Sequence, residues 1–181
     1  MRILLPPRWA LAAAALLALG AAAPRAHAQA SASNSINASG TVLAPISVVP
    51  GQSLSYGKIG TGTVKVVAPD DATSGRFAIQ GQGGAKVDIT LTLPTSLLNG
   101  ANTLAISGWT GTFGFGADAS GGTSFTPLSG VAINRTLPGA AGSPGQLIFY
   151  RLGAQVSPTS SQAPGDYTAP VGLNAIYTEI D

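Results

Sequence analysis

The feature that most constrains this chain is a period-two alternation of apolar and polar residues, carried in short runs from residue 36 onward. In residues 87–93, Val, Ile, Leu and Leu alternate with Asp, Thr and Thr. Successive side chains of a strand point to opposite faces of a sheet, so this run predicts a strand with one buried face. Gly, Pro, Ser and Asn separate the runs, and no ten-residue stretch combines a helical stripe with caps. The pattern predicts one all-β domain, a sandwich or barrel of antiparallel strands.

The alternation also predicts where the strands lie. The first expected strand spans residues 36–48, and its apolar residues share one face: Ile36, Ala38, Val42, Ala44, Ile46 and Val48. A turn is expected at Pro50-Gly51. Two hairpins should follow, one joining 54–59 to 63–67 and one joining 76–80 to 87–93. Further strands are expected at 104–106, 109–115, 146–156 and 167–180, with a loop at 119–126.

The N-terminus carries the pattern of a bacterial signal peptide. Arg2 and Arg8 precede an almost uninterrupted apolar run, residues 9–23, and Ala26-His27-Ala28 gives the small-x-small pattern of a cleavage site. A transmembrane helix needs about 20 apolar residues, more than this run supplies. We therefore expect cleavage between Ala28 and Gln29. Residues 1–28 would be the signal peptide and 29–181 one domain, in which 29–39 form a flexible N-terminal extension.

Cleavage changes the chemistry that the chain can offer. It would remove three of the nine basic residues and the only histidine, which leaves a net charge of −1. The positive charge of the whole chain therefore gives no reason to expect nucleic-acid binding. Without cysteine or histidine, cysteine–histidine zinc sites, cysteine nucleophiles and Ser-His-Asp triads are excluded for the mature chain. We expect no enzymatic activity, no cofactor, no metal and no transmembrane segment after cleavage.

Two binding features stand out, and each has a structural alternative. The strand at 36–48 could be an assembly strand that adds to a neighbouring molecule, or simply the first strand of a complete domain. Trp109 could be an aromatic platform for a sugar, or a core residue. Asp70, Asp71 and Asp118 lack the dense acidic spacing of a calcium loop, so turn formation and solubility are their expected roles.

Several of these runs resemble a bacterial secreted family, the domain of unknown function 4402. The resemblance rests on 45–48 (Pro-Ile-Ser-Val), 54–59 (Leu-Ser-Tyr-Gly-Lys-Ile), 76–81 (Arg-Phe-Ala-Ile-Gln-Gly), 87–94 and Gly165-Asp-Tyr167 followed by Tyr177. The C-terminal pattern is also similar to spore-coat-U-like and chaperone–usher pilus subunits. The resemblance implies an immunoglobulin-like, pilin-like sandwich, one that a strand from a neighbouring subunit or an envelope chaperone could complete.

Together these features predict a structural or surface protein that acts by protein–protein assembly, as a component of a fibre, a pilus-like structure or a coat. The predicted partners are further copies of the chain or an envelope chaperone. The predicted location is the periplasm, the cell surface or the extracellular space. The alternative is a monomeric carbohydrate- or ligand-binding module with Trp109 at its site.

Overall fold

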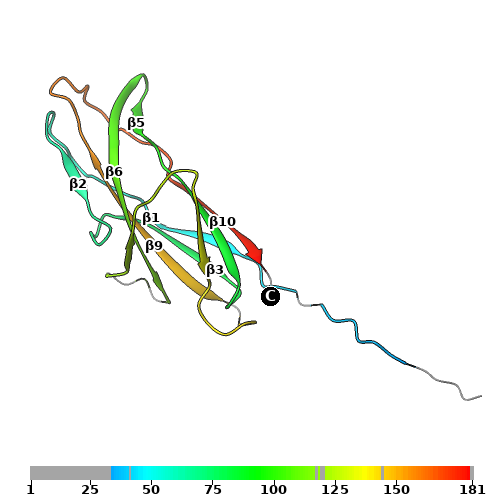
Figure 1. The fold of residues 1–181 in the computed structure, drawn as a ribbon. Helices are drawn as coiled ribbons and strands as arrows, with labels where there is room; N and C mark the ends of the chain where they lie inside the picture. The colour runs from blue at the N-terminus through cyan, green and yellow to red at the C-terminus, as the bar shows by residue number, and fades with distance from the viewer. Residues whose placement is uncertain (1–33, 41, 117, 119–120, 144, 180–181) are drawn as a thin grey trace, which may run out of the picture. The chain divides into compact units, whose positions relative to one another are not determined.

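The computed structural model describes residues 34–40, 42–116, 118, 121–143 and 145–179 (Figure 1). These residues form ten strands and no helix. The strands are β1 (Ser47–Gln52), β2 (Lys65–Val67), β3 (Gly75–Gly81), β4 (Lys86–Thr92), β5 (Ser96–Asn99), β6 (Asn102–Phe115), β7 (Thr123–Phe125), β8 (Ala132–Thr136), β9 (Gln146–Val156) and β10 (Gly172–Glu179). The chain divides into two units, Met1–Gly40 and Thr41–Asp181, and all ten strands belong to the second. Residues 34–40 have no regular secondary structure.

The strands form two antiparallel sheets, which confirms the prediction of an all-β sandwich. The larger sheet has the order β1-β3-β9-β6-β5, with β2 also paired to β9 and β7 also paired to β6. The smaller sheet has the order β10-β4-β8. In Figure 1 the orange β9 runs through the middle of the larger sheet. The long β9 pairs with β2, β3 and β6 and so forms the centre of the larger sheet.

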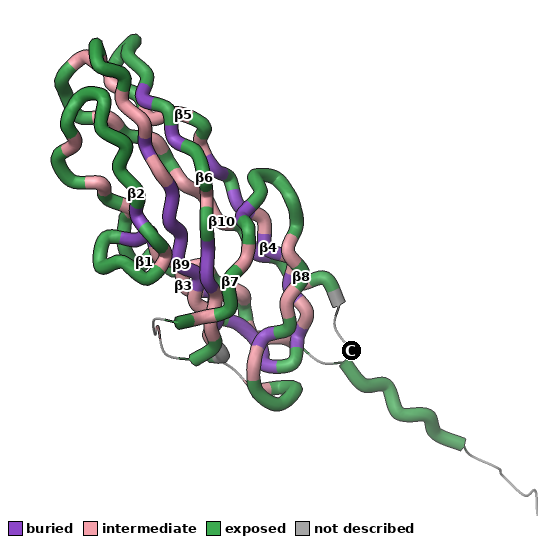
Figure 2. The backbone as a smooth tube through the Cα atoms, turned by 60° about the vertical axis from the view of Figure 1, so that its left-hand side comes forward, coloured by how far each residue is buried: buried purple, intermediate pink, exposed green. Residues whose placement is uncertain are grey.

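The core lies between the sheets and includes residues that the period-two pattern predicted to be buried. Val87, Ile89 and Leu91 of β4 are fully buried, as predicted, and face Ile148 and Tyr150 of β9 in one cluster or Leu152 in another. Buried stretches follow β4, β6 and β9 in Figure 2. Burial of these side chains contributes about 1.5–3 kcal/mol each, so the alternation supplies the main driving force for folding.

The predicted pairing of 76–80 with 87–93 was wrong. Both segments are strands, but β3 pairs with β1 and β9 whereas β4 pairs with β10 and β8. The glycine-rich link between them crosses from one sheet to the other. At Gly83 a Cβ atom would lie 2.7 Å from the Ala140 carbonyl oxygen, so this crossing requires glycine. Alternation predicts which face of each strand is buried, but not which sheet the strand joins. The buried faces of β3 and β4 point into the same core from opposite sheets.

The prediction for the first strand was also wrong in its bounds. The strand β1 begins at Ser47, and residues 42–46 have no strand structure. Pro50-Gly51 is not a turn, because Pro50 pairs with Phe77 inside β1 and a β-bulge follows it. Proline is tolerated more readily in β1 because β1 is an edge strand, of which only one side takes part in the hydrogen-bond ladder.

The predicted hairpin of 54–59 with 63–67 does not form. Only β2 is a strand, and it pairs with β9. Leu54, Tyr56 and Ile59 instead pack as an irregular segment against the buried cluster that contains Ile106 and Val156. Their apolar character is therefore used in the core without strand pairing.

The remaining strand predictions agree better with the structure. Strand β9 has the predicted bounds, whereas the two segments predicted around Leu104 and Trp109 are a single strand, β6, with an irregularity between Ser107 and Thr110. Gly108, at φ 61°, provides the left-handed conformation at this irregularity. The final strand begins at Gly172 rather than at Tyr167.

Candidate functional site

A cleft of about 310 Å³ opens on the side of the sandwich where β1 and β10 come into contact. Its rim is formed by the end of β1 and by residues 169–171, which precede β10. Ile106, Trp109 and Leu152 lie deeper in its lining. Because Ile106 and Leu152 belong to buried clusters, the cleft reaches the core from the outside.

Beside this cleft, β10 is the longer of the two edge strands of the smaller sheet. It pairs with β4 along one side, and among the described residues no strand pairs with its other side. Residues 172–178 contain no charged residue. Inward-facing side chains of this strand, Leu173 and Ala175, are apolar. An edge of this kind has free backbone donors and acceptors and is a template for pairing with another strand.

The other edges are shorter, interrupted or engaged. Strand β1 carries Pro50 and a bulge, both of which hinder pairing. Strand β5 exchanges two backbone hydrogen bonds with Thr168, at 2.9 and 3.0 Å from Leu98. Strands β2 and β7 have three residues each. Among the described strands, β10 is thus the edge best suited to accept a partner.

Tyr177 closes the other end of this side. Its hydroxyl oxygen accepts a hydrogen bond from Gln82 N at 2.8 Å and donates one to the Ala44 carbonyl oxygen at 3.0 Å. The Gln82 side-chain oxygen accepts a further bond from Ala44 N at 3.0 Å. These three bonds attach the chain at Ala44 to the end of β10 and to the crossing between the sheets.

This attachment divides the residues predicted as an assembly strand. Ile46 and Val48 pack against the core of their own domain, and Ala44 is held by the bonds just described. Ile36 and Val42 are 94% exposed, and Ala38 is exposed as well. The first group is therefore used within the domain, which leaves only the second group available to a partner. The predicted cleavage site, Ala28 and Gln29, lies outside the described residues.

Trp109 is half-buried rather than displayed on the surface. Its Nε1–H donates a hydrogen bond to the Pro94 carbonyl oxygen at 3.3 Å, and its ring packs against two of the three core clusters. The same residue lines the cleft beside β10. This packing agrees with the alternative that Trp109 is a core residue. Its role as a platform for a ligand stays a prediction, and the cleft is the place where such a ligand would bind.

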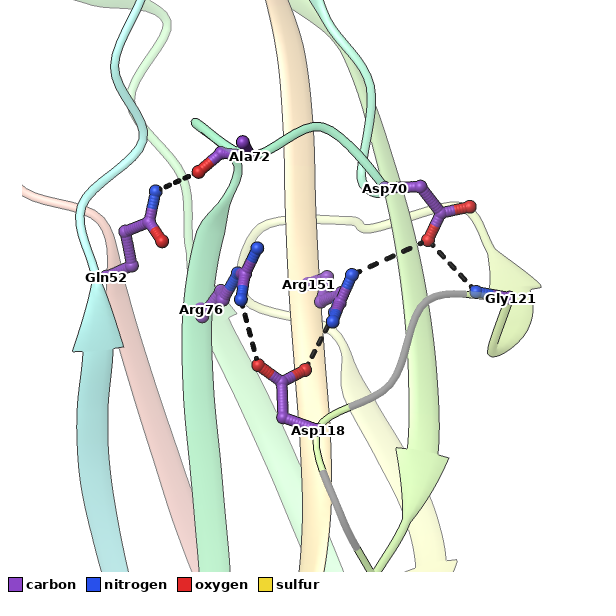
Figure 3. Close-up of polar contacts among 7 residues, drawn as sticks. All are labelled: Gln52, Asp70, Ala72, Arg76, Asp118, Gly121 and Arg151. Carbon is purple, nitrogen blue, oxygen red and sulfur yellow. Dashed lines mark hydrogen bonds and ion pairs between the residues drawn. The ribbon is translucent and has the colours of Figure 1, made fainter.

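A cluster of charged residues on the larger sheet was not predicted from the sequence (Figure 3). Arg76 of β3 and Arg151 of β9 are direct neighbours, and the Asp118 carboxylate bridges them. Its oxygens accept bonds from Arg76 Nη1 at 3.1 Å and from Arg151 Nε at 2.7 Å. Arg151 Nη1 also lies 3.8 Å from the Asp70 carboxylate. We call these four residues the carboxylate clamp.

The carboxylate clamp attaches two irregular segments to the sheet. Asp70 belongs to the segment between β2 and β3, and its carboxylate also accepts a hydrogen bond from Gly121 N at 3.2 Å. Asp118 and Gly121 belong to the segment between β6 and β7. Arg151 is only 7% exposed, so its charge needs these partners. Because the two arginines of the carboxylate clamp are paired with its two aspartates, we interpret the clamp as a structural feature that holds these segments in place.

The described residues contain no group of three or more side chains that could hold a metal ion. Within the same residues, no helix is long and apolar enough to cross a membrane. In comparisons with known proteins, neither a family model nor a curated protein matches the chain. The resemblance to secreted and pilus proteins therefore stays a prediction.

Proposed function

We propose that the chain is an exported surface or structural protein that assembles when a strand from another molecule adds to β10. The observation that carries this proposal is the unpaired side of β10, where residues 172–178 are uncharged, beside a cleft that reaches the core. An added strand would hydrogen-bond to the edge through its backbone and place alternate side chains toward the interior. The predicted signal peptide and the resemblance to pilin-like sandwiches agree with this proposal.

The proposed donor is the N-terminal segment of a second copy, ahead of Ala44. Its apolar residues Ile36, Ala38 and Val42 fall on one parity and are exposed. In an extended strand, residues of the same parity point to one face, so these three side chains could enter the cleft together. Residues 34–43 contain no charge, which matches the uncharged edge. Envelope location and an immunoglobulin-like topology belong to the same proposal.

The mature chain, residues 29–181, should form concentration-dependent oligomers, and Ile176→Lys should weaken them by about tenfold or more. Ile176 lies on β10 and is 53% exposed, so a lysine there should leave the fold intact while guarding the edge. Sedimentation velocity over a series of concentrations measures the effect. The matched control is Asn134→Lys, because Asn134 lies in the same row of the smaller sheet, on its opposite edge.

The control should assemble like the unmodified chain. Deletion of residues 29–39 should abolish assembly by removing the donor, and mixing this deletion variant with Ile176→Lys should yield mixed dimers through the intact donor of one and the intact β10 of the other. A chain that stays monomeric at high concentration would contradict the proposal. Equal loss of assembly in Ile176→Lys and Asn134→Lys would place the contact elsewhere.

The second candidate function is a monomeric carbohydrate- or ligand-binding module, favoured by the position of Trp109 in the cleft. A volume of about 310 Å³ is at the small end of ligand sites. An aromatic ring beside backbone carbonyls can pack against a sugar while its neighbours accept hydrogen bonds.

Trp109→Ala tests this candidate. We expect it to lower the free energy of unfolding by about 2 kcal/mol, because the ring packs against two core clusters and is only half-buried. Urea unfolding measures this loss, and calorimetric titration with neutral oligosaccharides measures binding in parallel. The binding module would be favoured over assembly if the unmodified chain and Trp109→Phe bind the sugar and Trp109→Ala does not, while all three proteins remain folded.

A further inference from the structure

The edge opposite β10 in the smaller sheet is β8, and its central inward-facing side chain is an arginine. Ile133 packs against the core, and Leu137, just beyond the strand, is 1% exposed. Arg135 lies between them with the same parity, so its side chain also points between the two sheets. The inward positions of β10, by contrast, carry Leu173, Ala175 and Tyr177.

Contacts across the interior confirm this direction for Arg135. Its guanidinium carbon lies 4.2 Å from the ring centroid of Phe113, on β6 of the larger sheet. Burial raises the pKa of Tyr150, on β9, to about 12, and the positive charge of Arg135 acts against that rise. Arg135 therefore reaches the aromatic residues of the opposite sheet.

The charge of Arg135 is only partly compensated. Its Nη1 donates a hydrogen bond to the Asn134 carbonyl oxygen at 3.0 Å, whereas its Nε is buried and has no hydrogen-bond partner among the described residues. No ion pair joins it to a carboxylate of the described residues. Its contact with the larger sheet includes the cation–π contact with Phe113, and such contacts are modest while one face stays near solvent.

Strand addition at β8 would change this balance. An added strand would place apolar side chains between the sheets beside Phe113 and would remove the remaining water from the guanidinium. Burying a cation without a carboxylate partner is strongly unfavourable. Inward-pointing charges are a known means by which sheet proteins block pairing at an edge.

We infer that Arg135 is a guard that prevents strand addition at β8 and so restricts assembly to β10. This inference rests on the proposed function and adds its specificity: each molecule accepts one strand, so chains join head to tail in a linear fibre rather than in a branched network. Arg135 is a specificity-determining residue in this scheme.

The test removes the charge of Arg135 and measures, separately for β8 and β10, whether the edge is covered in the assembled protein. Arg135→Met removes the cation and keeps an unbranched apolar side chain, Arg135→Gln is a second neutral variant if the first does not fold, and Arg135→Lys retains the charge. The chain contains no cysteine, so a single reporter thiol can be introduced by Thr136→Cys on β8 or by Asn174→Cys on β10. The rate of maleimide labelling, measured at low and high protein concentration, reports which edge is covered.

With Arg135 or Arg135→Lys, high concentration should slow labelling at position 174 by about tenfold and leave position 136 unchanged. In the neutral variants, labelling at position 136 should slow as well, and larger oligomers should appear by light scattering. Neutral variants that assemble like the unmodified chain with position 136 still open would overturn the guard while leaving addition at β10 intact. If only a neutral variant assembles, through position 136, the guard stands and the proposed function fails. If no protein assembles, both are overturned.

Discussion

Replacing Gly153 with valine should lower the free energy of unfolding of the domain by about 3 kcal/mol, because there is no room for a side chain at this position. Gly153 lies in β9 where its neighbour changes from β3 to β2. The chain leaving β2 crosses directly over it: a Cβ atom would collide with the Val67 carbonyl oxygen and lie 2.9 Å from Pro69 N. Urea unfolding followed by tryptophan fluorescence measures the change.

Gly114→Val is the matched control, since Gly114 is also a strand glycine, on the neighbouring β6, but has open space around its Cβ position. We expect this variant to be as stable as the unmodified chain or slightly more stable, because valine favours strands. Equal losses at both positions would mean that glycine is needed for a reason other than the close crossing of the two backbones.

Arg151→Met should cost about 2 kcal/mol and loosen both segments that the carboxylate clamp holds. The substitution removes a buried cation and leaves Asp118 with Arg76 alone and Asp70 without its ion pair. Hydrogen exchange gives a local measurement, because the amide of Gly121 donates to Asp70 and should exchange faster in the variant. Thermal unfolding gives the global loss.

Lys65→Met is the control for Arg151→Met, because it removes one positive charge from the adjacent strand β2 at an exposed position. It should leave both stability and the exchange of Gly121 nearly unchanged, as expected for an exposed charge. If it had the same effect as Arg151→Met, net charge rather than the carboxylate clamp would control stability. Assembly through β10 should persist in both variants, since the clamp lies on the larger sheet.

The sequence predicted the inward face of β4 correctly because this strand buries one face in the core while its other face is only partly buried. Val87, Ile89 and Leu91 therefore alternate with polar residues and mark the core. The bounds of β9 were also predicted correctly, although buried residues follow one another in that strand. The first strand and the hairpin at 54–67 were predicted wrongly for a different reason. At an edge or in an irregular segment, apolar residues such as Leu54 can pack on the core with no strand pairing, and alternation does not distinguish the two cases.

The candidate site was only partly visible in the sequence. Ile36, Val42 and Trp109 were singled out by residue type, and the structure gives them different surroundings: two are exposed and one lines the cleft. The importance of β10 could not be predicted, because an edge exists only when the order of strands is known. Arg135 had a weak sequence signal, an arginine between Ile133 and Leu137 at inward positions.

The sequence by itself determined the all-β class, the buried face of the central strands and the scarcity of catalytic side chains, because period, composition and inventory are local properties. Only the tertiary structure decided that β3 and β4 lie in different sheets, that Asp118 bridges Arg76 and Arg151, and that β10 is left unpaired. These features depend on contacts between residues far apart in the chain. Many pairings satisfy the same alternation, and the one that packs the core without collision, as at Gly153, is selected by the whole domain.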